Sequence, residues 1–160
     1  MEWVLEGKGV ATIKIYGSCC AIIDGVFYKR FDAKPGRKIP EGAIPCCDPD
    51  PITGHWPHWV KVDENNPSDK YFLAALDGHS PQEFEDGTYE AVGVHFNGNP
   101  YRMYCDVLIK HGVLVTYIPR DFEGIRDFLR GTREEGVVFW KDGEPQCKIK
   151  RTDFGFKWPL

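Results

Sequence analysis

Alternation of apolar and polar residues with a period of two constrains the fold of this chain more than any other feature. Residues 10–15 follow this pattern and stop before Gly17, and two more such runs, 20–23 and 26–30, flank the dipeptide Asp24-Gly25. An Asp-Gly pair between two alternating runs is typical of a β-hairpin with a tight turn. The sequence therefore predicts antiparallel strands joined by short turns.

The same alternation predicts most of the remaining strands, which are expected at 88–96, 106–109, 113–118, 137–140 and 146–151. Turns are expected at 97–100 and 141–143, where Asn, Asp, Gly and Pro gather. Residues 34–69 are rich in the same turn-forming residues and are predicted to form long packed loops.

One helix is predicted with defined ends. Asp121 can cap it, Ile125 and Leu129 share one face, and Gly131 stops it. The segment 70–76 is compatible with either a helix or a strand. The predicted fold class is α+β, built on antiparallel sheets.

Composition limits the possible classes of protein. The chain has 160 residues, which suits one domain, and no apolar run long enough for a membrane span. The first residues lack the pattern of a secretory signal, and the six cysteines, with the adjacent pairs Cys19-Cys20 and Cys46-Cys47, favour reduced thiols in a cytoplasmic compartment. A net charge of −4 argues against nonspecific coating of nucleic acid, although basic residues within 29–38 and 141–157 can meet phosphates locally.

The order of charged residues along the chain indicates a chemistry. Lys14 at a strand end is followed by Glu90, by Glu135-Gly136, and by Lys148 and Lys150. This order suits an enzyme that attacks the α-phosphate of a nucleoside triphosphate with a lysine amine, because the carboxylates can hold ribose and a metal ion while the other lysines offset phosphate charge. Each fragment alone has an ordinary alternative, since paired lysines on a strand are most often a solvated face.

The aromatic segment 54–60 has three interpretations. Two histidines and two tryptophans lie within it, which could indicate a metal site or a platform for RNA bases. A zinc site needs more ligands at better spacing, so a packed loop is the favoured interpretation. His111, beside Gly112, is expected to be a turn residue, and the paired cysteines are expected to be structural rather than nucleophilic.

These motifs together resemble a known family. The most specific segments are Gly-His-Trp-Pro-His-Trp-Val at 54–60, Asn-Gly-Asn-Pro-Tyr at 97–101, His111-Gly112, Glu135-Gly136, and Gly-Phe-Lys-Trp-Pro at 155–159. They resemble the ATP-dependent RNA ligases of the covalent nucleotidyltransferase superfamily, especially the 5′-to-3′ RNA ligase family described in animals.

The resemblance implies a reaction and its cofactors. Such an enzyme adenylates itself on a lysine, transfers AMP to an RNA 5′-phosphate and joins it to a 3′-hydroxyl, using ATP with Mg²⁺ or Mn²⁺. It further implies that residues 1–160 form a single minimal nucleotidyltransferase domain without an OB-fold or other appended domain. A monomer that acts on RNA ends and does not enter membranes is expected.

The resemblance also implies a role for each matching residue. Lys14 is the expected nucleophile, with Glu135, Lys148 and Lys150 as the other catalytic residues. The nucleotide-binding residues are expected to be Gly17, Arg30, Glu90, Lys148 and Lys150. The metal ligands are expected to be Glu90 and Glu135.

Tyr16 departs from the family pattern, which has aspartate or histidine at this position. An alternative therefore stays open, in which the chain is a catalytically impaired relative that binds nucleotides or RNA ends. Guanylyl transfer, as in capping enzymes, is disfavoured because no OB-type domain follows.

Overall fold

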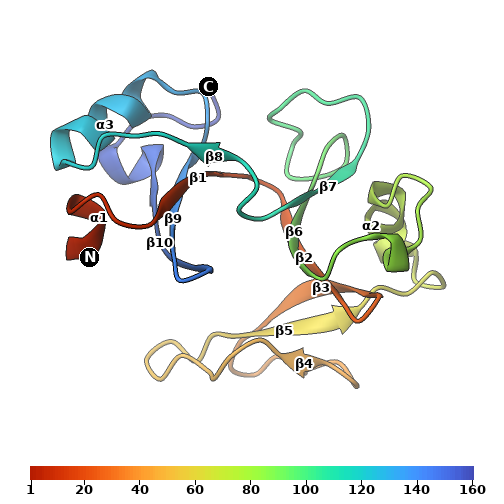
Figure 1. Cartoon of the computed structure of the whole chain (residues 1–160). Coiled ribbons are helices and arrows are strands. Elements are labelled where there is room, and N and C mark those ends of the chain that lie inside the picture. The colour runs from red at the N-terminus through yellow and green to blue at the C-terminus, as the bar shows by residue number, and fades with distance from the viewer. The chain divides into compact units, whose positions relative to one another are not determined.

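The computed structural model describes all residues 1–160 and divides into two compact units. The first unit contains Met1–Tyr16 and His111–Leu160, and the second contains Gly17–Lys110. Each unit holds one antiparallel sheet with few helices (Figure 1). The antiparallel sheets and the mixture of strands and helices were expected from the sequence, whereas a single nucleotidyltransferase domain stays a prediction.

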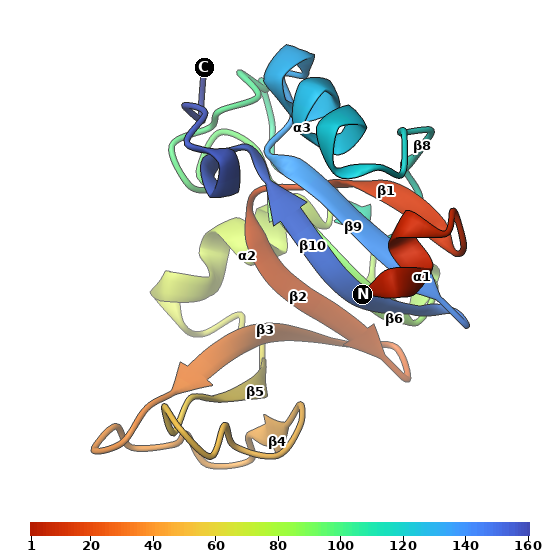
Figure 2. The ribbon, with the colours of Figure 1, turned by 90° about the vertical axis from the view of Figure 1, so that its left-hand side faces the viewer.

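The first unit is built on a four-stranded sheet in the order β10-β9-β1-β8. Its strands are β1 (Val10–Lys14), β8 (Val115–Thr116), β9 (Gly136–Lys141) and β10 (Glu144–Lys150). The helices are α1 (Glu2–Leu5), α3 (Phe122–Gly131) and a 3₁₀ turn at Arg151–Phe154. Figure 2 shows α3 beside the β10-β9-β1 part of this sheet.

The apolar face of the first sheet packs against α3. Val137 and Phe139 of β9 form a buried cluster with Ile125 and Leu129 of the helix. The side chain of Asp121 accepts a hydrogen bond from the Gly124 amide at 3.2 Å, so the predicted helix and its cap are confirmed. Because side chains alternate along a strand, the neighbouring residues of β9 point to the opposite face of the sheet.

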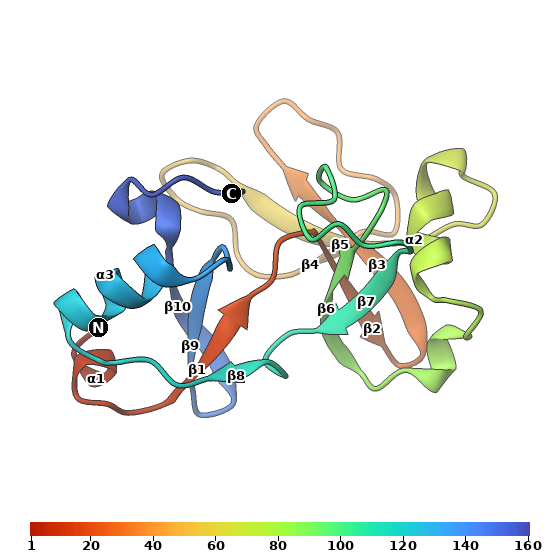
Figure 3. The ribbon, with the colours of Figure 1, turned by 90° about the horizontal axis from the view of Figure 1, so that it is seen from above.

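The second unit is built on a six-stranded sheet in the order β4-β5-β3-β2-β6-β7. Its strands are β2 (Ser18–Ile23), β3 (Val26–Ala33), β4 (Ile44–Pro45), β5 (Trp56–Lys61), β6 (Gly87–Val92) and β7 (Val107–Lys110). The segment that was compatible with a helix or a strand is helix α2 (Lys70–Ala75), and short 3₁₀ turns lie at Pro67–Asp69 and Pro81–Glu83. Figure 3 shows α2 beside this sheet.

The predicted hairpin between β2 and β3 is confirmed, and its turn has the expected backbone. Asp24 and Gly25 have φ angles of 50° and 73°, the left-handed conformation that a tight hairpin turn requires. Cys20 and Ile22 of β2 point into the core, where they pack with Phe27 and with residues of α2. The interpretation of the buried Cys20 as a core residue is therefore confirmed.

The prediction of long loops throughout 34–69 is wrong for Trp56–Lys61, which forms the interior strand β5. Pro57 and the surrounding turn residues obscured the alternation, and pairing with β3 on one side and β4 on the other supplies the strand's hydrogen-bond partners. His58 is buried in this strand, with its Nδ1 atom 2.9 Å from the Trp56 carbonyl oxygen.

Two other predicted strands are shorter than expected. The strand predicted at 88–96 ends at Val92, because Gly93 has a φ angle of 138° that leaves the strand conformation. The strand predicted at 113–118 is reduced to Val115–Thr116, which pairs only with β1. None of the helices has both the length and the apolar character that a membrane span needs.

Candidate functional site

Lys14, the last residue of β1, lies beside the carboxylate of Glu135. Its Nζ atom is 2.7 Å from Glu135 Oε2, and the two residues are 121 positions apart in the sequence. Glu135 is buried, and a buried carboxylate is stable only when a hydrogen-bond or charge partner satisfies it. The structure thus brings the predicted nucleophile and one predicted metal ligand into direct contact within the first unit.

Gly136 explains why a glycine follows this glutamate. It pairs with Lys14 of β1 on one side and with Lys150 of β10 on the other. A Cβ atom on Gly136 would lie 2.3 Å from the carbonyl oxygen of Ile149 and 2.8 Å from the Cα atom of Lys150. Only glycine allows the strands to approach this closely, so the Glu-Gly dipeptide fixes the spacing between Lys14 and Lys150.

Lys148 joins the same face of the sheet. It pairs with Val138, which pairs in turn with Thr12, two residues before Lys14. Side chains at alternate positions of a strand share a face, so Lys148 and Lys150 lie on the same side as Lys14. The four predicted catalytic residues therefore lie at one sheet. Lys14, Lys148 and Lys150 are on the face opposite α3, and Glu135 lies next to that face, in contact with Lys14.

Tyr16 is packed against the end of the chain. Its ring meets the Trp158 ring edge-on, with a centroid separation of 4.8 Å and an interplanar angle of 72°. Edge-to-face packing of this kind is a favourable aromatic arrangement. Tyr16, two positions after the predicted nucleophile, therefore packs against the segment 155–159, one of the segments on which the predicted resemblance rests.

Arg151 does not meet phosphates, contrary to the expectation for the basic residues within 141–157. Its guanidinium is buried and donates to the carbonyl oxygens of Leu129, Arg130 and Thr132, and to that of Lys157 at 3.0 Å. These bonds satisfy carbonyl groups at the C-terminal end of α3. Arg151 is therefore a structural residue, which its position in a basic segment did not reveal.

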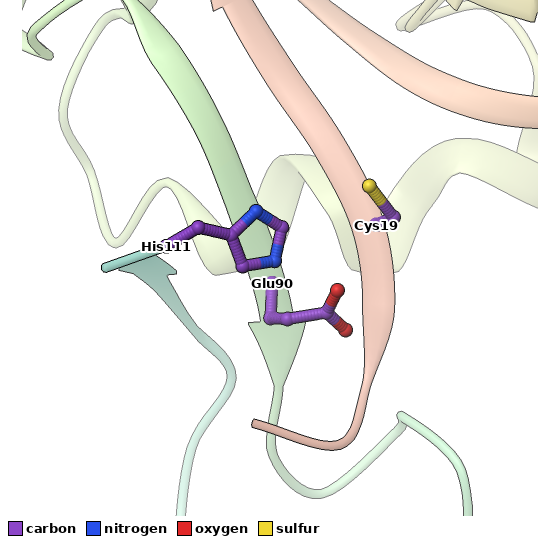
Figure 4. A group of neighbouring side chains, drawn as sticks. All are labelled: Cys19, Glu90 and His111. Carbon is purple, nitrogen blue, oxygen red and sulfur yellow. The ribbon is translucent and has the colours of Figure 1, made fainter. Parts of the chain in front are cut away.

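Glu90 and Arg30 lie in the second unit, on either side of Cys19. Glu90 of β6 pairs directly with Cys19 of β2, and Figure 4 shows both side chains. Burial raises the pKa of the Cys19 thiol to about 11, with a further rise from the charge of Glu90 and a partial offset from Arg30. The thiol is protonated at neutral pH, so Cys19 is not an activated nucleophile.

Gly17 has a packing reason to be glycine. A Cβ atom there would lie 2.2 Å from the carbonyl oxygen of Ala91, and the Gly17 carbonyl accepts a hydrogen bond from Asn97 Nδ2 at 2.6 Å. These contacts fix the start of the second unit. A role of Gly17, Arg30 and Glu90 in nucleotide binding stays a prediction. His111 and Gly112 form a turn, as expected.

Comparison with known proteins gives one group of relatives. The chain is 28% identical to "RNA ligase 1" of Danio rerio over 139 residues, which cover 67% of this chain and 43% of that protein. It is 25% identical to "RNA ligase 1" of Rattus norvegicus over an alignment of 227 positions, covering 96% of this chain and 69% of that protein. No protein-family model matches the chain. The chain spans less than half of the Danio rerio protein, and its sequence is similar to that of RNA ligases.

Proposed function

We propose that this chain is an ATP-dependent RNA ligase that carries AMP on Lys14. One observation supports the proposal most strongly: Lys14 ends a strand, contacts the buried Glu135 at 2.7 Å, and shares a sheet face with Lys148 and Lys150. Similarity to RNA ligase 1 proteins supports RNA as the substrate.

The first step forms a covalent bond between the lysine and the nucleotide. The neutral Nζ atom of Lys14 attacks the α-phosphorus of ATP, an N–P bond forms, and the bond from that phosphorus to the bridging oxygen breaks, which releases pyrophosphate. Glu135 Oε2, at 2.7 Å, accepts a hydrogen bond from Nζ, so it orients the amine and is in reach of the proton that leaves. Lys148 and Lys150 offset the negative charge that develops on the phosphates.

Two further transfers complete the reaction. The RNA 5′-phosphate attacks the phosphorus of lysyl-AMP, which breaks the N–P bond, restores Lys14 and gives an RNA with AMP joined through a pyrophosphate linkage. The 3′-hydroxyl of a second RNA end then attacks the 5′-phosphate, and AMP leaves as the phosphodiester forms. In this proposal Glu90 holds ribose hydroxyls, and Gly17 and Arg30 contact the nucleotide.

The donor set of the first unit fits Mg²⁺ or Mn²⁺. These ions prefer oxygen ligands and commonly bind one or two carboxylates together with substrate phosphates. Glu135 supplies such a carboxylate in the first unit, beside Lys14. Glu90, in the second unit, is the other residue proposed as a metal ligand. When bound, the metal ion would neutralise part of the charge of the triphosphate.

Label transfer from ATP tests the proposal. The protein is incubated with α-labelled ATP and Mg²⁺ or Mn²⁺, and covalent label is measured on a denaturing gel. Lys14→Ala should abolish labelling, because it removes the amine that forms the bond. Lys8→Ala is a matched control in the same unit, since Lys8 is exposed and pairs only with the nearby Glu6.

Two outcomes would contradict the assignment. Labelling that persists in Lys14→Ala at the level of the unchanged protein would show that another residue carries the nucleotide. A bond that is stable in acid and labile in alkali would be an ester rather than the phosphoramidate that a lysine forms.

A second candidate function rests on Tyr16. Tyr16 stands where the related family has aspartate or histidine, so no side-chain carboxylate is present at this position to orient an adenylate. The ring packs against Trp158 instead. In this alternative the chain binds ATP or RNA ends without sealing them. Labelling without sealed RNA product would favour it over the complete ligase reaction.

A further inference from the structure

Four side chains on the neighbouring strands β3 and β5 alternate between aromatic and basic. Tyr28 pairs directly with Lys61, and Arg30 pairs directly with Trp59. The two strands lie side by side in the second unit (Figure 2). Directly paired residues have their Cβ atoms about 4.5–5.5 Å apart and share a face of the sheet. These four residues, which we call the aromatic–basic block, therefore form one contiguous group with the rings on one diagonal and the charges on the other.

The aromatic–basic block lies on the face of the sheet opposite α2. Phe27, one position before Tyr28, belongs to the buried cluster that contains Ala75 of α2. Because side chains alternate along a strand, Tyr28 and Arg30 point away from that cluster. The two basic members of the block are exposed, and the two aromatic members are half-buried. The block is therefore outside the core of the second unit.

Trp59 differs from the other four tryptophans in its contacts. Each of those four contacts a cation, another ring or a hydrogen-bond acceptor; they are Trp3, Trp56, Trp140 and Trp158. The ring of Trp59 has no such partner within the chain. No buried side-chain nitrogen lacks a hydrogen-bond partner, so the indole N–H of Trp59 reaches the surface. Tryptophans with an apolar ring and an accessible N–H are enriched where proteins bind a partner.

The basic residues of β3 and β5 differ in how their charges are neutralised. Arg30 Nε donates to Asp32 Oδ1 at 2.8 Å, whereas Lys61 forms no ion pair. Lys29, which points to the other face of the sheet, pairs with the buried carboxylate of Asp69. Lys61 is therefore the cation of the block that no carboxylate of the chain neutralises.

This combination of groups suits single-stranded nucleic acid. Unstacked bases stack on aromatic side chains of a sheet, and nearby cations contact the sugar-phosphate backbone. Diagonal residues of neighbouring strands lie about 7–8 Å apart, so the two rings of the block can receive two bases of one extended strand. The bases of duplex RNA are stacked on one another, and their faces cannot bind in this way.

We infer that the aromatic–basic block binds single-stranded RNA, with one base stacked on Trp59, a second on Tyr28, and a backbone phosphate at Lys61. The inference rests on the proposed function, because that function supplies RNA as the substrate. It assigns to the second unit a surface that holds the strand leading to the RNA end.

ATP also carries a base and phosphates, but the strand order favours RNA. Trp59 and Glu90 lie on β5 and β6, and two strands separate them in the order β5-β3-β2-β6. Three strand spacings amount to about 14 Å. A nucleoside whose ribose is held by Glu90 is too short to place its base on Trp59.

RNA binding measured by fluorescence anisotropy tests this inference. The probe is a short 5′-phosphorylated single-stranded RNA of mixed sequence with a fluorescent 3′ end. Trp59→Leu keeps an apolar side chain but removes the ring, and it should weaken binding by about fivefold to a hundredfold, the effect of losing one stacked base. Tyr104→Leu is the matched control, because the ring of Tyr104 is 100% exposed in the same unit. This control should bind RNA as the unchanged protein does.

Two further measurements separate stacking from a change in charge. A duplex of the same sequence should bind Trp59→Leu and the unchanged protein equally, because its bases are not available for stacking. Lys61→Gln should reduce the slope of the logarithm of affinity against the logarithm of salt concentration by about 0.7, the contribution of one phosphate contact to a single strand. Equal losses of single-stranded and duplex binding in Trp59→Leu would overturn the stacking role.

Trp59→Phe guards against a loss of structure in Trp59→Leu. Phenylalanine keeps a ring, so the variant should keep most of the RNA affinity. Base stacking on an indole quenches its fluorescence, so unlabelled RNA should lower the tryptophan fluorescence of the unchanged protein. The decrease should be absent in Trp59→Phe, although four tryptophans remain. The same decrease in Trp59→Phe would overturn the assignment of the stacked base to Trp59.

Label transfer from ATP is measured on the same variants over a range of ATP concentrations and needs no RNA. A raised ATP requirement with retained RNA affinity in Trp59→Leu would assign the base to ATP and overturn the RNA assignment. Equal single-stranded RNA affinity of Trp59→Leu and the unchanged protein, or no RNA binding by the unchanged protein, would also overturn the inference. Failure of labelling in the unchanged protein would overturn the proposed function, while the RNA affinities still decide the role of the aromatic–basic block.

Discussion

After Lys14, Glu135 is the residue on which the proposed chemistry depends most, because its carboxylate carries the charge beside the lysine amine. Glu135→Gln keeps the size and one oxygen acceptor but removes the negative charge beside Nζ, which is 2.7 Å away. The rate of label transfer should fall by a factor on the order of a hundred or more, because this is the usual effect of removing one preorganised electrostatic group from an active site. The measurement is the initial rate of covalent labelling with Mg²⁺.

The neighbouring Glu134→Gln provides the control for this prediction. Burial raises the pKa of Glu134, but this residue makes no ion pair with Lys14, so its replacement should leave the labelling rate nearly unchanged. If Glu135→Gln also labelled at a near-normal rate, Glu135 would have no electrostatic role in the reaction.

At the scale of the secondary-structure elements, the close approach of β9 and β10 decides where the lysines lie. Gly136→Ala would place a methyl group 2.3 Å from the Ile149 carbonyl oxygen, so the two strands must separate. We expect the free energy of unfolding to fall by about 1–3 kcal/mol, as for other overpacked sites, and labelling to fall with it. Urea unfolding followed by circular dichroism measures the first effect.

Gly131→Ala is a matched glycine substitution in the same unit. No atom lies within 4 Å of the added carbon, and Gly131 ends α3 without a positive φ angle. Alanine should therefore leave stability unchanged or raise it by up to about 1 kcal/mol. Equal stability of the two variants would show that the close approach of β9 and β10 is not a constraint.

At the scale of the whole molecule, the prediction of one domain can be tested by its unfolding. Leu129 is fully buried in the core of the first unit, and Leu129→Ala should lower the free energy of unfolding by about 2–5 kcal/mol. If the chain unfolds as one domain, this change should lower hydrogen-exchange protection in Gly17–Lys110 as well. Protection lost only in the first unit would contradict a single cooperative domain.

The sequence alone determined the features that depend on neighbouring residues. The Asp24-Gly25 hairpin and the Asp121-capped helix follow from local backbone preferences, and both are present where expected. The spacing of Lys148 and Lys150 likewise places both on one face of a strand, whatever that strand pairs with.

The tertiary structure decided everything that depends on remote partners. Lys14 meets Glu135 across 121 positions only because β1 pairs with β9, and no local pattern specifies that pairing. Arg151 has a structural role although its neighbours in the sequence are basic, because its guanidinium donates hydrogen bonds to carbonyl groups at the end of α3. The ring of His95, in the loop between β6 and β7, stacks on Tyr71 of α2 with a centroid separation of 3.8 Å, a contact between residues 24 positions apart that no local pattern indicates. Burial and strand register depend on the whole chain, so they cannot be read from the periodicity of one segment.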